Sequence, residues 1–293
     1  MALMSPQRYA QRYWSLEVPL ADGPFWVRVS KYRLRTPDAE KDYLFAALKD
    51  LFKTKQKADP SSRLQLTVNG QPADFGGTGE MLHRVVNPFF GKGSPEDCQI
   101  VLQLAVLLRN KTKADLQQYC NDFLGLDCNG FVGNFLFRVR KGNGWRVDAP
   151  DGAAGPSDTI TQIMDHSGGA PVHTTEELVS NRTYVLGEVD SSYRIIPGGL
   201  TADEGHIVIT EPGRKMGSGS GTYEPTMNLD GQDADAIGNI AFWGVESTGG
   251  LGLVESWYAI SQLRVGNKDI DGVFKCFRGC KRQYLNFRIV ALS

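Results

Sequence analysis

The sequence lacks any long apolar run. No window approaches the roughly eighteen uncharged apolar residues that a membrane-spanning helix needs. The first 20 residues also lack a basic stretch followed by an apolar one, which marks a secretory signal. We therefore expect a chain without a membrane span that is synthesised in the cytoplasm. If it acts in a periplasm or at a cell wall, we expect export by a route other than the general secretory one.

An excess of one charge is also missing. The chain has 32 basic and 33 acidic residues, which leaves a net charge of −1. This balance gives no electrostatic reason to expect nucleic acid or an anionic membrane as the main partner. Its 293 residues predict one elaborated domain or two small ones.

Cysteine and histidine are sparse, with five and four residues. Five cysteines in a chain of this length do not predict a disulfide framework. Cys98 and Cys120 fall in apolar helical patterns and are expected to be buried, unreactive thiols. Cys276 and Cys280 are spaced too widely for a zinc knuckle and lack a second pair, so we favour a bridge between them, formed on export, over metal binding. No metal or organic cofactor is expected.

Strand and helix signals alternate along the chain. Alternating apolar residues predict strands at 25–30 and 64–68, the second followed by the turn signal Asn69-Gly70. Helices are predicted after Thr36-Pro37, from Ser94 to Asn110, and from Thr112 to Gly125. Further strands are predicted at 183–189, 192–196, 206–210, 240–245 and 287–291, with surface loops at 142–169 and 211–238. We expect the second of these loops to lie near the rim of an active site.

Cys128 differs from the other thiols because it lies at the predicted start of a helix. The apolar residues Phe131, Val132, Phe135 and Leu136 follow it with helical spacing. A helix N-terminus carries roughly +0.5 of a charge and unpaired N–H groups, which favour a thiolate over a thiol. Cys128 is therefore a candidate nucleophile.

A thiol nucleophile needs a base within hydrogen-bond reach and a third group that orients the base. Among the four histidines, His83 falls in a helix-like stretch, whereas His166 and His173 fall in a loop and are fallback bases. His206 begins the apolar strand Gly205-His206-Ile207-Val208-Ile209, from which its side chain can point at a helix end packed across the sheet edge. His206 is the predicted base, with structural capping as the alternative.

Two of these segments resemble a known family. Asp127-Cys128-Asn129-Gly130-Phe131-Val132 is similar to the Asp-Cys-Ser-Gly-Phe/Leu-Val signature of the NlpC/P60 superfamily of papain-like cysteine peptidases. The His206 strand is similar to that family's His-Val-Gly-Ile-Tyr strand. The likeness covers residues 115–265, and the cysteine motif is its specific part. Asn129 stands where the family has serine.

The resemblance implies an α+β fold with a papain-like NlpC/P60-type core, in which a catalytic helix packs on an antiparallel sheet. It implies a catalytic domain at 111–293 and an N-terminal extension of helices and strands at 1–110. The family's third catalytic position maps onto Glu246, for which a surface carboxylate is the alternative. Tyr119 matches a tyrosine that lines the family's substrate site, although its spacing also fits a core residue. Asp127 is the second predicted substrate-binding residue.

The activity that the resemblance implies is cysteine-dependent hydrolysis of an amide bond in peptidoglycan stem peptides. Such an enzyme fits a bacterial effector toxin or a lysin, with an immunity protein or a secretion machinery as partners. Two alternatives stay open. One is a papain-like acyltransferase or deamidase that acts on a protein or lipid. The other is a non-catalytic phage or secretion-apparatus module with a relic site.

Overall fold

The computed structural model describes residues 4–34, 38–58, 65–68, 71–74, 84–141, 155–179, 181–198, 205–217 and 240–292. Its helices are α1 (Pro6–Trp14), α2 (Ala39–Ala58), η1 (Asn87–Phe90), α4 (Pro95–Arg109), α5 (Lys113–Phe123), α6 (Cys128–Lys141), α7 (Ile160–His166) and η2 (Thr175–Glu177). Its strands are β1 (Leu16–Val18), β2 (Phe25–Val27), β3 (Gln65–Val68), β4 (Gln71–Asp74), β5 (Ala170–Pro171), β6 (Tyr184–Glu188), β7 (Ile207–Gly217), β8 (Ile240–Thr248), β9 (Gly252–Val265), β10 (Lys268–Arg278) and β11 (Gln283–Ala291).

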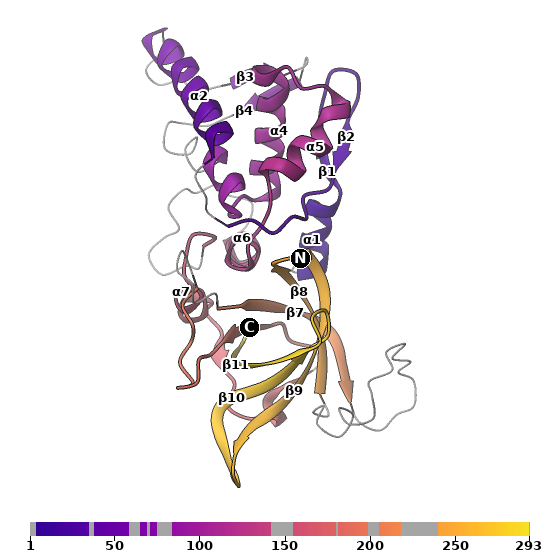
Figure 1. Cartoon of the computed structure of the whole chain (residues 1–293), viewed down its shortest axis with the longest axis vertical. Coiled ribbons are helices and arrows are strands. Elements are labelled where there is room, and N and C mark those ends of the chain that lie inside the picture. Colours follow the sequence, from indigo (N-terminus) through magenta and orange to yellow (C-terminus); the bar gives the residue numbers. More distant parts are fainter. Residues whose placement is uncertain are drawn as a thin grey trace.

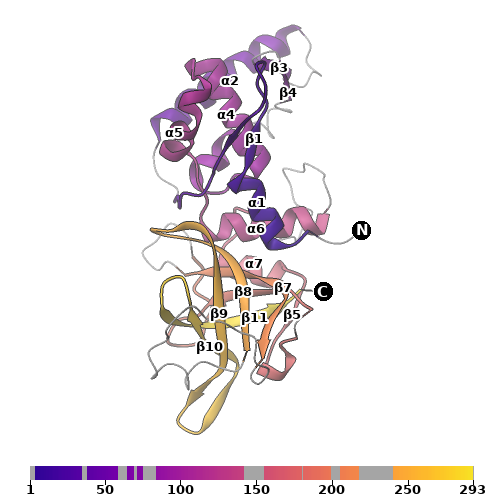
Figure 2. The same cartoon turned by 90° about the vertical axis from the view of Figure 1, so that its right-hand side faces the viewer.

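The molecule has a helical part and a sheet part. Helices α2, α4 and α5 gather with the hairpins β1–β2 and β3–β4 at one end, and strands β6 to β11 form the other (Figure 1). Helix α6 lies between the two parts, and α1 lies beside it over strands β7 and β8 (Figure 2). The predicted α+β class is therefore confirmed. No helix of the described residues is long and apolar enough to cross a membrane.

Strands β6 to β11 close on themselves. Neighbouring strands pair antiparallel in the order β10-β9-β8-β7-β6-β11, and β10 also pairs with β11. Because side chains alternate between the two faces of a strand, this closed sheet has its own apolar core, which includes Val208, Phe242, Tyr258 and Phe274. Residues of the opposite parity on the same strands, such as Ile207, face the helices.

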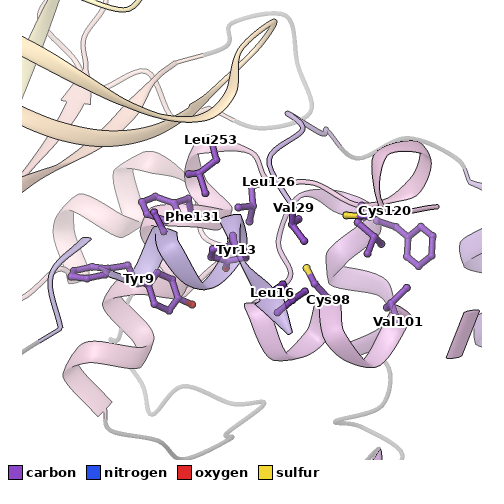
Figure 3. Close-up of a cluster of buried hydrophobic side chains, with 14 of the residues drawn as sticks. Tyr9, Tyr13, Leu16, Val29, Cys98, Val101, Cys120, Leu126, Phe131 and Leu253 are labelled. Atoms are coloured by element: carbon purple, nitrogen blue, oxygen red, sulfur yellow. The ribbon is translucent and has the colours of Figure 1, made fainter. Parts of the chain in front are cut away.

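The helical core is continuous with the outer face of the closed sheet. Tyr9 and Tyr13 of α1 lie against Phe131 of α6, with ring centroids 6.0 and 6.2 Å apart. The same cluster takes in Cys98 of α4 and Leu253 of β9 (Figure 3). Residues on both sides of the predicted boundary at 110 thus share one core, and the division at 110 stays a prediction.

Local signals in the helical part are reproduced by the structure. Ser94 caps α4 in a reciprocal pair with Asp97, whose carboxylate accepts the Ser94 N–H at 3.1 Å. Asn110 ends α4 in a left-handed conformation, and Thr112 caps α5. Strands β3 and β4 pair on either side of the predicted turn, whose residues 69 and 70 lie outside the described ones.

One predicted strand and two predicted loops are wrong in part. Segment 192–196 is a turn with a single bridge, from Val189 to Ile195. The 142–169 loop contains α7, because Thr159 and Gln162 form a capping box before a helix that buries Ile160. Residues 211–217 continue β7, since a register shift between Thr210 and Lys215 accommodates the Pro-Gly pair within the strand. Residues 218–239 lie outside the described ones.

Strands β9 and β10 were not predicted. A continuous buried run at 256–260 hides the alternation of β9, because that strand packs on both faces. Three glycines also interrupt the apolar pattern around the two strands, at Gly252, Gly266 and Gly272, and each has positive φ. The sequence of β9 and β10 therefore lacks the alternation by which a strand is recognised.

Replacing Tyr13 by phenylalanine tests how α1 is held against the loop at 91–93. The Tyr13 hydroxyl donates to the Gly93 carbonyl at 3.1 Å in a buried position, so its loss leaves that carbonyl unpaired and should lower the free energy of unfolding by about 1–2 kcal/mol. Tyr43→Phe is the matched control, because its hydroxyl bonds a carbonyl at 3.3 Å from a side chain that is 44% exposed. Urea titration measures both, and equal losses would contradict the assignment.

Candidate functional site

The chain two residues before α6 is anchored from two sides. Leu126 donates its N–H to the Lys31 carbonyl at 2.8 Å and accepts the Arg33 N–H at 3.1 Å. The Ser247 hydroxyl of β8 also donates to the Leu126 carbonyl, at 2.7 Å. These bonds join an N-terminal segment, α6 and the sheet, and they fix where α6 begins.

Asp127 caps α6. Its carboxylate accepts the Gly130 N–H at 2.5 Å, the contact that defines a helix N-cap. The Lys92 ammonium binds the same carboxylate at 2.7 and 2.9 Å. Burial raises the Asp127 pKa, and Lys92 opposes the rise. The structure thus gives Asp127 a structural role, and its predicted role in substrate binding stays a prediction.

Position 130 requires glycine because the backbone of α6 approaches the backbone of Gly91 closely there. A Cβ atom at this position would overlap the carbonyl oxygen of Gly91, in the loop that also carries Lys92. Gly91 itself has a φ of 73°, in the left-handed region, and its carbonyl accepts the Asp127 N–H at 3.0 Å. The loop at 91–93 is therefore packed directly against the start of α6.

Cys128 is the first residue of α6 and is 6% exposed. Its Sγ lies 3.3 Å from the Asn129 Oδ1 and 3.9 Å from the Gly205 carbonyl oxygen. Burial, assisted by the Asp127 charge, raises the pKa of this thiol to about 12, although backbone N–H groups of Ile207 and Asn129 act in the other direction. Desolvation outweighs the backbone N–H groups at the helix terminus and favours a resting thiol, so the thiolate expected at this position stays a prediction.

His206 and Glu246 are brought together across 40 residues of sequence. The Nε2 of His206 lies 2.5 Å from the Glu246 Oε2, and the Glu246 side chain is fully buried. Arg278 binds the same carboxylate through Nε, 3.1 Å from Oε1, and through Nη2 to Oε2. The alternative of a surface carboxylate at Glu246 is wrong, because this acid is paired in the interior.

The electrostatics of this group define the state of the imidazole. Burial would raise the Glu246 pKa, but the hydrogen bonds from His206 and Arg278 and the Arg278 charge hold that pKa well below its usual range. Burial lowers the His206 pKa, Glu246 opposes this, and Arg278 lowers it further. At neutral pH the imidazole is therefore neutral. Because an ionised carboxylate only accepts, the proton of the neutral ring is on Nε2, which leaves Nδ1 as the ring's acceptor nitrogen.

The Cys128 sulfur lies against the backbone around His206, whereas the imidazole bonds Glu246. His206 has the parity of Val208, which faces the core of the closed sheet, and Ile207 between them faces the helices. The Cys128 Sγ lies against the backbone on both sides of His206, near the Gly205 carbonyl and the Ile207 N–H. Among the described residues, neither the sulfur nor any other group forms a hydrogen bond with Nδ1 of His206. The structure thus brings together the elements that carry the two groups. Hydrogen bonds of this kind are often long in an enzyme without substrate and tighten when it binds.

Tyr119 lies in the helical core. Its hydroxyl donates to the Glu40 Oε1 at 3.0 Å, the side chain is 2% exposed, and its ring packs on Phe123. The core alternative for Tyr119 is therefore confirmed, and nothing in its described contacts links it to Cys128. The fallback base His173 pairs with Asp271 at 3.1 Å on the surface. His83 lies outside the described residues.

Arg278 and Cys280 are the site residues that the sequence analysis missed. Arg278 ends an apolar strand, and a charge in such a place needs a buried partner. This position could have marked Arg278 as a site residue from the sequence. The Cys280 Sγ lies 3.0 Å from the Glu246 Oε1, whereas Cys276 faces the core of the closed sheet. All five cysteines are free, so the predicted bridge between Cys276 and Cys280 is absent. The described residues contain no group of three or more potential metal ligands.

The state of the Cys128 thiol is testable by alkylation. In a Cys280→Ser protein, which lacks the most exposed thiol, iodoacetamide modification of Cys128 should accelerate about tenfold per pH unit between pH 7 and 10, because only the thiolate reacts. Peptide mass spectrometry gives the rates. The same protein in urea is the control, with rates that level off near pH 8.5, about the pKa of a free cysteine. A rate for the folded protein that is constant over this range would indicate a resting thiolate.

Comparison with protein-family models, curated proteins and solved structures finds no match to this chain. The resemblance to NlpC/P60 peptidases therefore depends on the two short motifs around Cys128 and His206.

Proposed function

We propose that this chain is a cysteine-dependent hydrolase of amide bonds that uses Cys128, His206 and Glu246. The observation that carries the proposal is the buried pair of His206 and Glu246, 2.5 Å apart, with the Cys128 sulfur at the N-terminus of α6 in contact with the backbone next to His206. A carboxylate that fixes the tautomer of a neutral imidazole is the arrangement that general-base catalysis needs. The motif around Cys128 supports peptidoglycan stem peptides as the substrate class.

The proposed reaction starts from a neutral thiol and a neutral imidazole. As the Cys128 sulfur attacks the amide carbon, its proton passes to Nδ1 of His206, and the Glu246 carboxylate stabilises the imidazolium. The N–H of Cys128, at the start of α6, is placed to donate to the developing oxyanion. Nδ1 then protonates the departing amine, the C–N bond breaks, and a thioester remains. Water opens the thioester, and its proton returns through Nδ1.

A relic site in a binding module is the second candidate. The low exposure of Cys128, the Asn129 oxygen at 3.3 Å from its sulfur and the raised thiol pKa favour this candidate. The two candidates differ in what the fold must do. Catalysis needs an opening that admits a peptide to the sulfur, whereas a binding module needs none.

Digestion of peptidoglycan sacculi tests the proposal. The wild-type protein should release stem-peptide fragments that mass spectrometry identifies, and Cys128→Ala should reduce release by at least about 10³-fold. Glu246→Gln should reduce it by about 10²- to 10⁴-fold, because the imidazole loses its orienting charge. Cys120→Ala is the control, since this buried thiol lies in α5.

The outcomes separate the candidate functions. Release that survives in Cys128→Ala would contradict the role of this thiol. No release by the wild-type protein would contradict the hydrolase, and a mass increase on an added amine acceptor would then identify the transferase. Absence of both reactions, with unchanged folding of the protein, would favour the relic site.

A further inference from the structure

Arg278 is a buried cation at one end of the closed sheet. It is 3% exposed and pairs in register with Tyr258 of β9 and Gln283 of β11. It follows Phe274 and Cys276 on the face of β10 that contributes to the core of the closed sheet. A charge in such a place is costly unless it is paired and hydrogen-bonded.

The Glu246 carboxylate is bound by donors on both of its oxygens. Arg278 Nε and the Cys280 thiol lie 3.1 and 3.0 Å from Oε1. Arg278 Nη2 and His206 Nε2 share Oε2. A carboxylate held by a planar guanidinium fork has a defined plane, and that plane sets the direction from which the imidazole is bonded.

The charges of the three groups balance only while His206 is neutral. Glu246 and Arg278 cancel each other in the interior, where a single uncompensated charge costs most. Without Arg278, the buried carboxylate would be neutralised by protonating the imidazole, because an opposite charge within about 4–6 Å favours the charged form. An imidazolium cannot take the thiol proton.

We propose that Arg278 is a positioning residue of the hydrolytic site: it neutralises and orients Glu246, and so it keeps His206 a neutral base with Nδ1 free for the Cys128 proton. This inference deepens the proposed function and depends on it for its catalytic meaning. The coupling between Arg278 and His206 is a property of the fold that can be measured without any substrate.

Within the part of the chain that the structure describes, the other titratable groups around His206 do not replace Arg278. Glu188 of β6 approaches through its backbone N–H, which donates to the His206 carbonyl at 2.8 Å, and burial raises the pKa of its side chain. Tyr258 of β9 and Cys280 after β10 are neutral at pH 7, because burial and Glu246 raise both pKa values. Lys281 acts on His206 with the same sign as Arg278 but more weakly. On the side of α6, Cys128 is a thiol and Asp127 is paired with Lys92.

Titration of His206 by NMR tests the inference. In Arg278→Met the His206 pKa should rise by about one unit or more, since the carboxylate then lacks its cation. Arg278→Lys should leave the pKa near the wild-type value. In the double variant Arg278→Met/Glu246→Gln the pKa should fall back, because the uncompensated carboxylate is gone. Arg288→Met is the matched control, since Arg288 is exposed on β11 and binds the Tyr193 carbonyl.

A purely structural role for Arg278 would give a different pattern. Loosened packing would persist in the double variant, whereas the electrostatic shift reverses there. An unshifted or lowered His206 pKa in Arg278→Met would overturn the inference. If that variant does not fold, Glu246→Gln alone decides, because it leaves Arg278 uncompensated and must lower the His206 pKa below that of the wild type. The His206 resonance is assigned by its loss in His206→Gln.

Kinetics separate this inference from the proposed function. With sacculi as substrate, the acid limb of kcat/KM should move to higher pH in Arg278→Met by the same amount as the NMR shift, since only the neutral imidazole accepts the proton. A shifted pKa in a protein without hydrolase activity would contradict the function and leave the coupling standing. Hydrolysis with an unshifted acid limb would contradict the role of Arg278.

Discussion

The buried carboxylate of Glu246 is the constraint on which the site depends. It is fully buried and accepts hydrogen bonds from strand β7 through His206 and from the end of strand β10 through Arg278. A carboxylate in the interior is stable only when its partners stay in place, because each lost donor leaves an unpaired charge. The closure of the sheet supplies this, since β10 pairs with β11 and brings Arg278 back to β8 and its neighbours.

The same burial changes the chemistry expected of Cys128. A thiol at a helix terminus in water would favour its anion, but here the desolvation of the sulfur is the larger effect. A neutral thiol then requires a neutral base, and a neutral imidazole next to a buried carboxylate requires a compensating cation. In the proposed mechanism Arg278 is that cation. The protonation state of the sulfur on α6 is thereby linked to a guanidinium on β10.

Much of the site was predictable from local sequence, whereas its surroundings were not. Cys128, His206 and Glu246 were identified from two short motifs and one mapped position, and the structure places the last two in contact. Arg278 and Cys280 were missed because their role comes from sheet closure, a contact across more than 30 residues that no local pattern encodes. The predicted starts of α4 and α5 at Ser94 and Thr112 are confirmed, but the register shift in β7 and the two-sided burial of β9 removed the alternation on which strand prediction depends.

The position of Cys128 relative to His206 depends on segments far apart in the chain. Segment 31–33, the loop at 91–93 and Ser247 of β8 all contact the first turn of α6 or the two residues before it. His206 is placed by β6 and β8 through the pairing of β7. The elements that carry Cys128 and His206 therefore come together only when the helical core and the closed sheet have both formed, because neither part alone holds both residues. Residues 1–110 contribute to the site through this packing, which explains why the chain has one continuous core across the predicted boundary.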